Sequence, residues 1–168
     1  MITKTKVSGG VASLLALLLL SPVWAMAAGP AGKNTDPLTA KELKSLYADR
    51  TWVWKTGGGR FNAENSRFLA YVKEKSGESY GKGRWDVDNN GKLCIRAWWH
   101  AADGVGGGAT CFGHIRIGNT IYQRRYPNGH WYVFRHAQER AGDEALKLIA
   151  ADPVSDKAMN LKQRMMKK

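Results

Sequence analysis

The chain has 168 residues, with 26 Lys and Arg against 14 Asp and Glu, and therefore a formal net charge of +12. This length predicts one domain, and a hydrophobic share of 43% is enough to bury a core, which excludes wholesale disorder. Two cysteines are too few for a disulfide-dense miniprotein, and a single apolar run excludes a protein with several membrane spans.

Residues 1–27 have the pattern of a secretory signal peptide. Lys4 and Lys6 form a basic start, residues 11–20 are apolar, and residues 25–27 are the small residues that a signal peptidase recognises. The apolar run would span about 15 Å as a helix, which is too short for a lasting membrane anchor. Cleavage after Ala27 predicts a periplasmic or secreted bacterial protein without a transmembrane segment. Its charge falls from +12 to +10, because two lysines and no acid leave.

A short leader and one helix are predicted next. Residues 28–37 are rich in Gly, Pro, Asn and Asp, which is typical of a flexible leader. Thr39 and Glu42 then have the spacing of a capping box, and the helix is expected to end near Arg50. The hydrophobic residues that flank this box or share one helix face are Leu38, Leu43, Leu46 and Tyr47.

Between residues 51 and 136 the hydrophobic pattern takes period two, which indicates half-buried β-strands. Eight strands are expected, at 51–55, 59–62, 67–74, 79–87, 92–100, 110–117, 120–126 and 130–136. The Gly-Asn and Asn-Gly pairs at 118–119 and 128–129 favour hairpins. We therefore predict a mainly β domain over residues 38–136. Its antiparallel meander would curl into a lipocalin-like up-and-down barrel or a curved half-barrel. A flatter sheet packed against the helix is the alternative.

Residues 137–168 are expected to form a helical, basic C-terminal tail. Its apolar residues Ala145, Leu146, Leu148 and Ile149 favour a docked helix that stops at the Asp152-Pro153 pair. Residues 155–168 are expected to be solvated and frayed, with a helix at a membrane interface as the alternative.

Several short motifs stand in order along the predicted strands. They include Thr51-Trp52-Val53-Trp54, Gly83-Arg84-Trp85, Thr110-Cys111-Phe112-Gly113-His114 and Gly129-His130-Trp131. From about Leu43 to His136 this series resembles an exported proteobacterial family known as domain of unknown function 995. The resemblance implies export, one β-rich domain and paired cysteines, and it implies no catalytic residue. Residues 104–108 lie outside the motifs and are expected to form a glycine-rich loop.

The two cysteines are expected to form a disulfide. Cys94 and Cys111 lie on consecutive predicted strands, and an oxidising compartment favours their pairing. Pairing of 94 with 111 places Trp98 opposite Gly107, where a large ring can cover a bare backbone. Zinc binding by Cys111 and His114 is the alternative, but residues three apart on a strand point to opposite faces.

The sequence carries no strong signature of a catalytic, metal or cofactor site. Residues 86–91 match only the first half of a calcium-binding loop, since its twelfth position is Ala97 rather than Glu. No Gly-x-Ser-x-Gly elbow is present. His114 is the best candidate for acid–base chemistry, as in a small hydrolase, but a hydrogen-bonded structural histidine is the favoured interpretation. We expect neither cofactor nor metal, and a binding protein rather than an enzyme.

Aromatic and basic residues on the predicted strands favour ligand binding. Trp98 and Trp99 are adjacent, so one of them faces away from the core and is available to stack on a sugar ring or a lipid headgroup. The candidate ligand-binding residues are Arg96, Trp98, Arg116, Tyr122, Arg124 and Arg125. We expect a non-catalytic binding or envelope-associated module for an anionic or amphiphilic ligand, such as a lipid, lipopolysaccharide or acidic glycan. A protein-interaction or inhibitor module is the alternative, and nucleic acid is not an expected partner.

Overall fold

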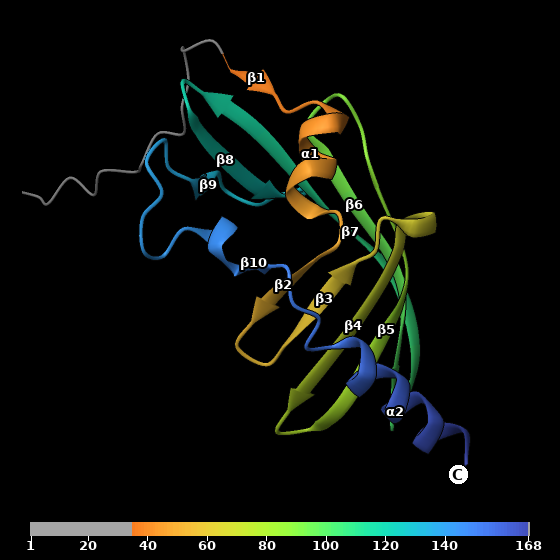
Figure 1. Cartoon of the computed structure of the whole chain (residues 1–168). Coiled ribbons are helices and arrows are strands. Elements are labelled where there is room, and N and C mark those ends of the chain that lie inside the picture. The colour runs from red at the N-terminus through yellow and green to blue at the C-terminus, as the bar shows by residue number, and fades with distance from the viewer. Residues whose placement is uncertain (1–34, 168) are drawn as a thin grey trace, which may run out of the picture.

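The protein is a curled antiparallel half-barrel with two helices (Figure 1). The computed structural model describes residues 35–167, so the expected signal peptide and most of the expected leader lie outside the described residues. Nine strands follow one hydrogen-bonded path in the order β10-β2-β3-β4-β5-β6-β7-β8-β9, and β1 joins at β7. The strands are β1 (Asp36–Pro37), β2 (Arg50–Trp54), β3 (Gly57–Phe61), β4 (Arg67–Glu74), β5 (Gly77–Val87), β6 (Lys92–Ala101), β7 (Gly104–Ile117), β8 (Thr120–Arg125), β9 (Tyr132–Arg135) and β10 (Leu148–Ile149).

The predicted meander is confirmed, with one correction in β7. The eight expected strands correspond to β2 to β9, paired in chain order. Residues 104–108 are not a loop, because β7 begins at Gly104 and pairs with β6 from there. The predicted register also holds: Trp98 lies opposite Gly107, and a Cβ at Gly107 would stand 2.9 Å from the Trp98 ring. The short strands β1 and β10 were not predicted, because two residues are too few to show a hydrophobic pattern of period two.

Helix α1 (Ala40–Tyr47) begins at the predicted capping box and lies against the concave face of the sheet. Thr39 Oγ1 accepts a hydrogen bond from the Glu42 amide at 3.3 Å, and the Glu42 carboxylate accepts one from the Thr39 amide at 2.8 Å. The helix ends earlier than Arg50, because Asp49 adopts a left-handed φ of 53° and its amide donates to the Phe61 carbonyl at 2.7 Å. That bond starts the sheet immediately after the helix.

The second helix lies on the convex face, where the sequence predicted a solvated tail. At the start of α2 (Ser155–Met166), the Asp152 carboxylate accepts a hydrogen bond from the Ser155 amide at 3.0 Å, so the first amide of the helix has a partner. Its buried residues pack on β4 and β5, in a cluster of Tyr71, Tyr80, Val154, Ala158 and Leu161. The expectation of a frayed tail is therefore wrong. The helix predicted around 145–149 is instead a 3₁₀ turn, η2 (Glu144–Lys147), followed by β10.

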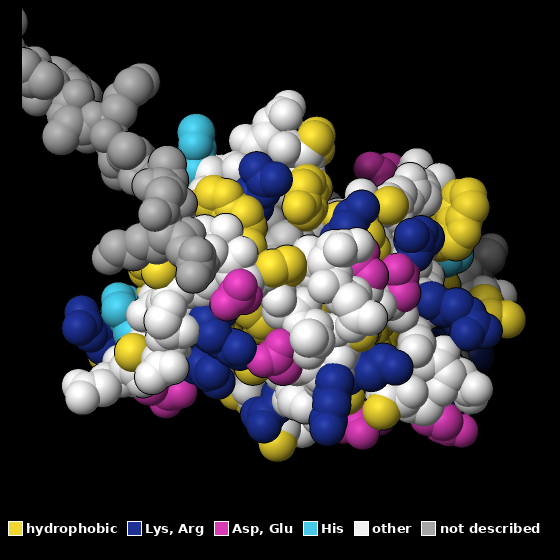
Figure 2. Space-filling model, turned by 90° about the horizontal axis from the view of Figure 1, so that it is seen from above, with side chains coloured by type: hydrophobic (Ala, Val, Ile, Leu, Met, Phe, Trp, Pro, Cys, Tyr) yellow, Lys and Arg dark blue, Asp and Glu magenta, His cyan; other side chains and the backbone are white. Residues whose placement is uncertain are grey.

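The surface charge is distributed over several elements. On the face shown in Figure 2, Lys and Arg side chains are spread among Asp and Glu and do not gather in one patch. Neither helix among residues 35–167 combines the length and the hydropathy needed to cross a membrane.

Candidate functional site: an aromatic pocket in the half-barrel

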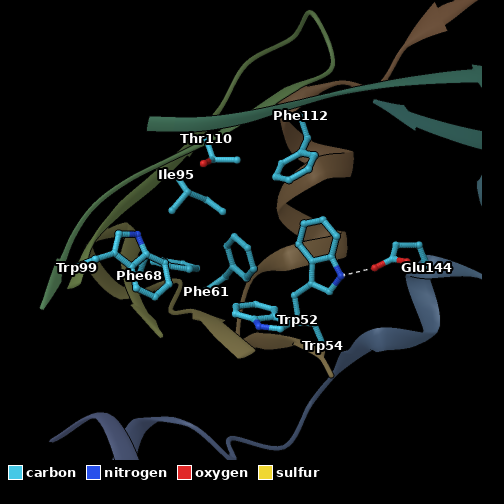
Figure 3. A pocket seen from close by; sticks show the side chains of 9 residues that line it. All are labelled: Trp52, Trp54, Phe61, Phe68, Ile95, Trp99, Thr110, Phe112 and Glu144. Carbon is cyan, nitrogen blue, oxygen red and sulfur yellow. Dashed lines mark hydrogen bonds between the residues drawn. The ribbon is translucent and has the colours of Figure 1, made fainter. Parts of the chain in front are cut away.

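The concave face holds a pocket of about 280 Å³ between β2 on one side and β6 and β7 on the other (Figure 3). Its lining is dominated by aromatic and aliphatic side chains: Trp52, Trp54, Phe61, Phe68, Ile95, Trp99, Thr110, Phe112 and Glu144. Trp52 and Phe112 meet across the hollow with ring centroids 5.1 Å apart. The curl of the sheet brings Trp52 of β2 close to Phe112 of β7, although the four strands β3 to β6 separate β2 from β7 on the hydrogen-bonded path.

Small residues in the floor of the sheet create the hollow. One row across five strands reads Trp52, Gly59, Ala70, Gly81 and Trp99, so two indoles stand at the ends of three small residues. A Cβ at Gly81 would stand 3.1 Å from the Trp99 ring. Glycine there therefore lets the indole lie close to the backbone and turn a flat aromatic face toward the pocket.

The rim combines an exposed indole with one carboxylate. Trp54 is 39% exposed. Glu144 is the one charged residue in the pocket lining among the described residues, and its Oε1 accepts a hydrogen bond from Trp52 Nε1 at 2.8 Å. Its other oxygen lies 2.7 Å from Lys147 Nζ. Glu144 thus fixes the Trp52 ring while its charge is balanced by Lys147.

Behind Trp52 the core contains a hydrogen-bonded polar network centred on His114. Tyr47, whose ring centroid lies 6.0 Å from that of Trp52, donates its hydroxyl proton to His114 Nε2 at 2.8 Å. Gln123 Nε2 donates to the Tyr47 hydroxyl at 2.8 Å, and Tyr132 donates to the Gln123 carbonyl oxygen. The Gly91 carbonyl lies 3.1 Å from His114 Nδ1 and can only accept, so these partners assign the proton to Nδ1.

This network gives His114 a structural role. Its side chain is fully buried, with 0% exposure, and burial lowers its pKa to about 4. At neutral pH the imidazole is therefore uncharged, and both ring nitrogens are occupied by partners within the core. Burial also raises the pKa of Tyr132 to about 12. A substrate has no access to His114 in this arrangement, so the geometry does not favour acid–base chemistry by this residue.

The cysteines lie on the opposite face from His114. Cys94 and Cys111 form a disulfide across β6 and β7, with their Cα atoms 4.1 Å apart. Because Cys111 and His114 are three residues apart on β7, their side chains point to opposite faces and do not share a metal. Within residues 35–167 no cluster of three or more His, Cys, Asp or Glu side chains is placed to hold a metal ion.

Residues 14–154 match the family model described as Protein of unknown function (DUF995). The chain belongs to this family. No curated protein and no solved structure matches the chain. The DUF995 match includes every residue that lines the concave pocket and ends immediately before α2.

The ligand-binding residues predicted from the sequence do not form one site on this DUF995 fold. Arg96 and Trp98 lie on the convex face of β6, and Trp98 is 62% exposed. Arg116 pairs with Glu42 of α1 at 2.7 Å, on the side of the concave core. The remaining three residues lie on β8: Tyr122 is half-buried, Arg125 is exposed, and Arg124 lies 4.7 Å and 4.9 Å from the ring centroids of Tyr126 and Trp131.

The pocket was only partly visible in the sequence. Strand alternation places Trp52 and Trp54 on one face of β2, and Ile95 and Trp99 on one face of β6. All four residues line the pocket. Glu144 was missed because it lies in a 3₁₀ turn that sequence periodicity does not place near β2.

Proposed function

We propose that this protein is a non-catalytic binding module that holds the apolar part of an amphiphilic ligand in the concave aromatic pocket. The observation that carries the proposal is an open hollow lined by aromatic faces, with one balanced carboxylate at its rim. Ligand sites are typically concave and mostly apolar, with a few polar groups that orient the ligand. At about 280 Å³ the pocket has room for one short alkyl chain or one ring system, rather than for several chains.

An exported, oxidising location of the protein supports a ligand from the bacterial envelope. The Cys94–Cys111 disulfide is compatible with an oxidising location, and residues 1–27 have the pattern of a bacterial signal peptide. A periplasmic or secreted protein meets lipids, lipopolysaccharide and acidic glycans. The net charge of +10 that remains without residues 1–27 favours those that carry anionic groups.

Binding to this pocket is expected to depend on alkyl chain length. Titration with lysophosphatidylcholines of increasing chain length should show affinity rising roughly fourfold per added methylene until the pocket is full, because each buried methylene contributes about 0.8 kcal/mol. Thr110→Phe places a ring in the pocket and should abolish this gain. Val105→Phe on the same strand is the matched control, because Val105 is exposed and points to the convex face.

Two outcomes of that titration would contradict the proposal. The first is an affinity that does not change with chain length. The second is equal weakening of binding by Thr110→Phe and Val105→Phe.

An anionic lysophosphatidylglycerol of equal chain length should bind more tightly at low salt only, since salt screens its attraction to the basic protein.

A free sheet edge favours a protein-interaction module as the second candidate function. Residues 104–111 of β7 pair with β6 on one side and with no other strand of the described chain. The exposed part of this edge, 104–109, contains neither the Lys nor the Pro that commonly protects an edge from strand addition. We expect Val105→Lys to release a partner that the unaltered protein retains from envelope extracts at high salt. Retention by both proteins would contradict the use of this edge.

A further inference from the structure

Three arginines lie side by side on the convex face of the sheet. Arg67 of β4 is directly opposite Arg84 of β5, and Arg84 is directly opposite Arg96 of β6. Like charges directly opposite each other destabilise a sheet. This row therefore works against folding, and a bound anion would relieve it.

The carboxylates near this row stand at its ends. Glu64 lies 3.1 Å from Arg67 in an exposed pair, and Asp86 pairs with the exposed Arg96. Arg84, in the middle, donates to the Asn65 carbonyl at 2.9 Å and forms no ion pair with a carboxylate of the described residues. The centre of the row is thus the position where the positive charge is least compensated.

The row borders a cleft between the sheet and α2. This cleft has a volume of about 580 Å³, and its lining includes Arg67, Lys82, Arg84 and, from α2, Lys162. No Asp or Glu of the described residues lines it. Four cationic side chains therefore face one hollow without an acidic partner inside it, which makes its charge complementary to an anionic ligand.

An aromatic surface continues the cleft toward β7. Trp98 is directly opposite Lys82 across β5 and β6, and its ring lies over Gly107, where an added Cβ would stand 2.9 Å from it. The indole is therefore held flat on the sheet, yet 62% of Trp98 is exposed. A flat exposed indole suits the apolar face of a sugar ring, and the planar arginine fork suits a carboxylate or a sulfate.

We propose that this convex cleft, formed by Arg67, Lys82, Arg84 and Lys162 and extended by Trp98, binds an anionic saccharide. Arg84 and the two lysines hold carboxylate or sulfate groups, and a sugar ring stacks on Trp98. The site is distinct from the concave pocket, because the two lie on opposite faces of the sheet. The proposal therefore does not depend on the proposed function.

The test is calorimetric titration of the full-length mature protein with three probes: oligogalacturonate, a dextran sulfate oligomer and neutral dextran. We expect binding of at least one anionic probe at low salt and none of the neutral one. Arg84→Gln should weaken binding about tenfold, because it removes a charged hydrogen-bonding group. Trp98→Leu should weaken it several-fold. Arg140→Gln is the matched control, since it removes the same charge from an exposed position outside the cleft, and should change affinity less than twofold.

The outcomes separate the proposal from simple charge attraction. Equal weakening by Arg84→Gln and Arg140→Gln, or no binding of either anionic probe, would overturn the site. Unchanged binding by Trp98→Leu would overturn the stacking role and with it the saccharide assignment. Without ligand, Arg84→Gln should raise the midpoint of thermal unfolding because it relieves the arginine row, and a lowered midpoint would show that Arg84 is structural. Binding of only one anionic probe identifies the acidic group that the site takes.

Discussion

The free energy of unfolding is expected to fall by about 3 kcal/mol as the pH drops from 6.5 to 4, through His114 alone. In the folded protein, burial keeps this imidazole neutral and lowers its pKa to about 4. The unfolded chain takes up the same proton near the ordinary histidine value of 6.5. Between these values the unfolded state binds more protons, so the stability present above pH 6.5 is lost as the pH falls.

Urea unfolding at several pH values between 7 and 4 measures this loss. His114→Gln keeps a polar side chain in the core but cannot titrate, so its stability should be nearly independent of pH in this window, whatever its stability at pH 7. His130→Gln, at an exposed position, should retain the full pH dependence. Equal pH dependence in the unaltered protein and His114→Gln would contradict the buried neutral state. Hydrogen bonds from Thr39 and Arg116 lower the pKa of the Glu42 carboxyl group to about 2. Glu42 therefore contributes to the pH dependence of stability only below about pH 4.5.

Loss of the disulfide is expected to cost about 3 kcal/mol of stability. The bridge joins residues 17 apart in sequence, and closing a loop of this size restricts the unfolded chain by about that amount. Replacing both cysteines by alanine keeps the buried Cys94 position apolar and should lower the midpoint of urea unfolding accordingly. The reduced unaltered protein is the control, and its midpoint should agree with that of the double variant. Equal midpoints for the double variant and the oxidised protein would contradict the contribution of the bridge.

Much of the sheet could be predicted because its signals are local. Alternating apolar residues and Gly-Asn or Asn-Gly turns determined the order and approximate bounds of β2 to β9. The start of β7 was missed because a run of glycines has no alternation, and pairing with β6 makes it a strand. The docking of α2 on the sheet was missed although Asp152 precedes apolar residues at 154, 158, 161 and 165, because the many lysines suggested a solvated terminus.

The site was harder to predict than the fold, because it depends on how far the sheet curls. Alternation places Trp52 and Trp99 on apolar faces, but no local pattern shows that Trp52 meets Phe112 across the half-barrel. The sequence drew attention to Arg96 and Trp98 by their charge and adjacency, and these residues lie on the convex face. Only the strand register shows that Arg96 aligns with Arg84 and Arg67.

The indole N–H resonances of ¹⁵N-labelled protein test the concave binding site most directly. Titration with a lysophosphatidylcholine below its critical micelle concentration should shift the resonances of Trp52, Trp54 and Trp99, which line the pocket. The resonances of Trp98 and Trp131, which lie outside it, should stay in place. Shifts confined to Trp98 and Trp131, or no shift at any of the five, would contradict the proposal that this half-barrel holds the apolar part of its ligand.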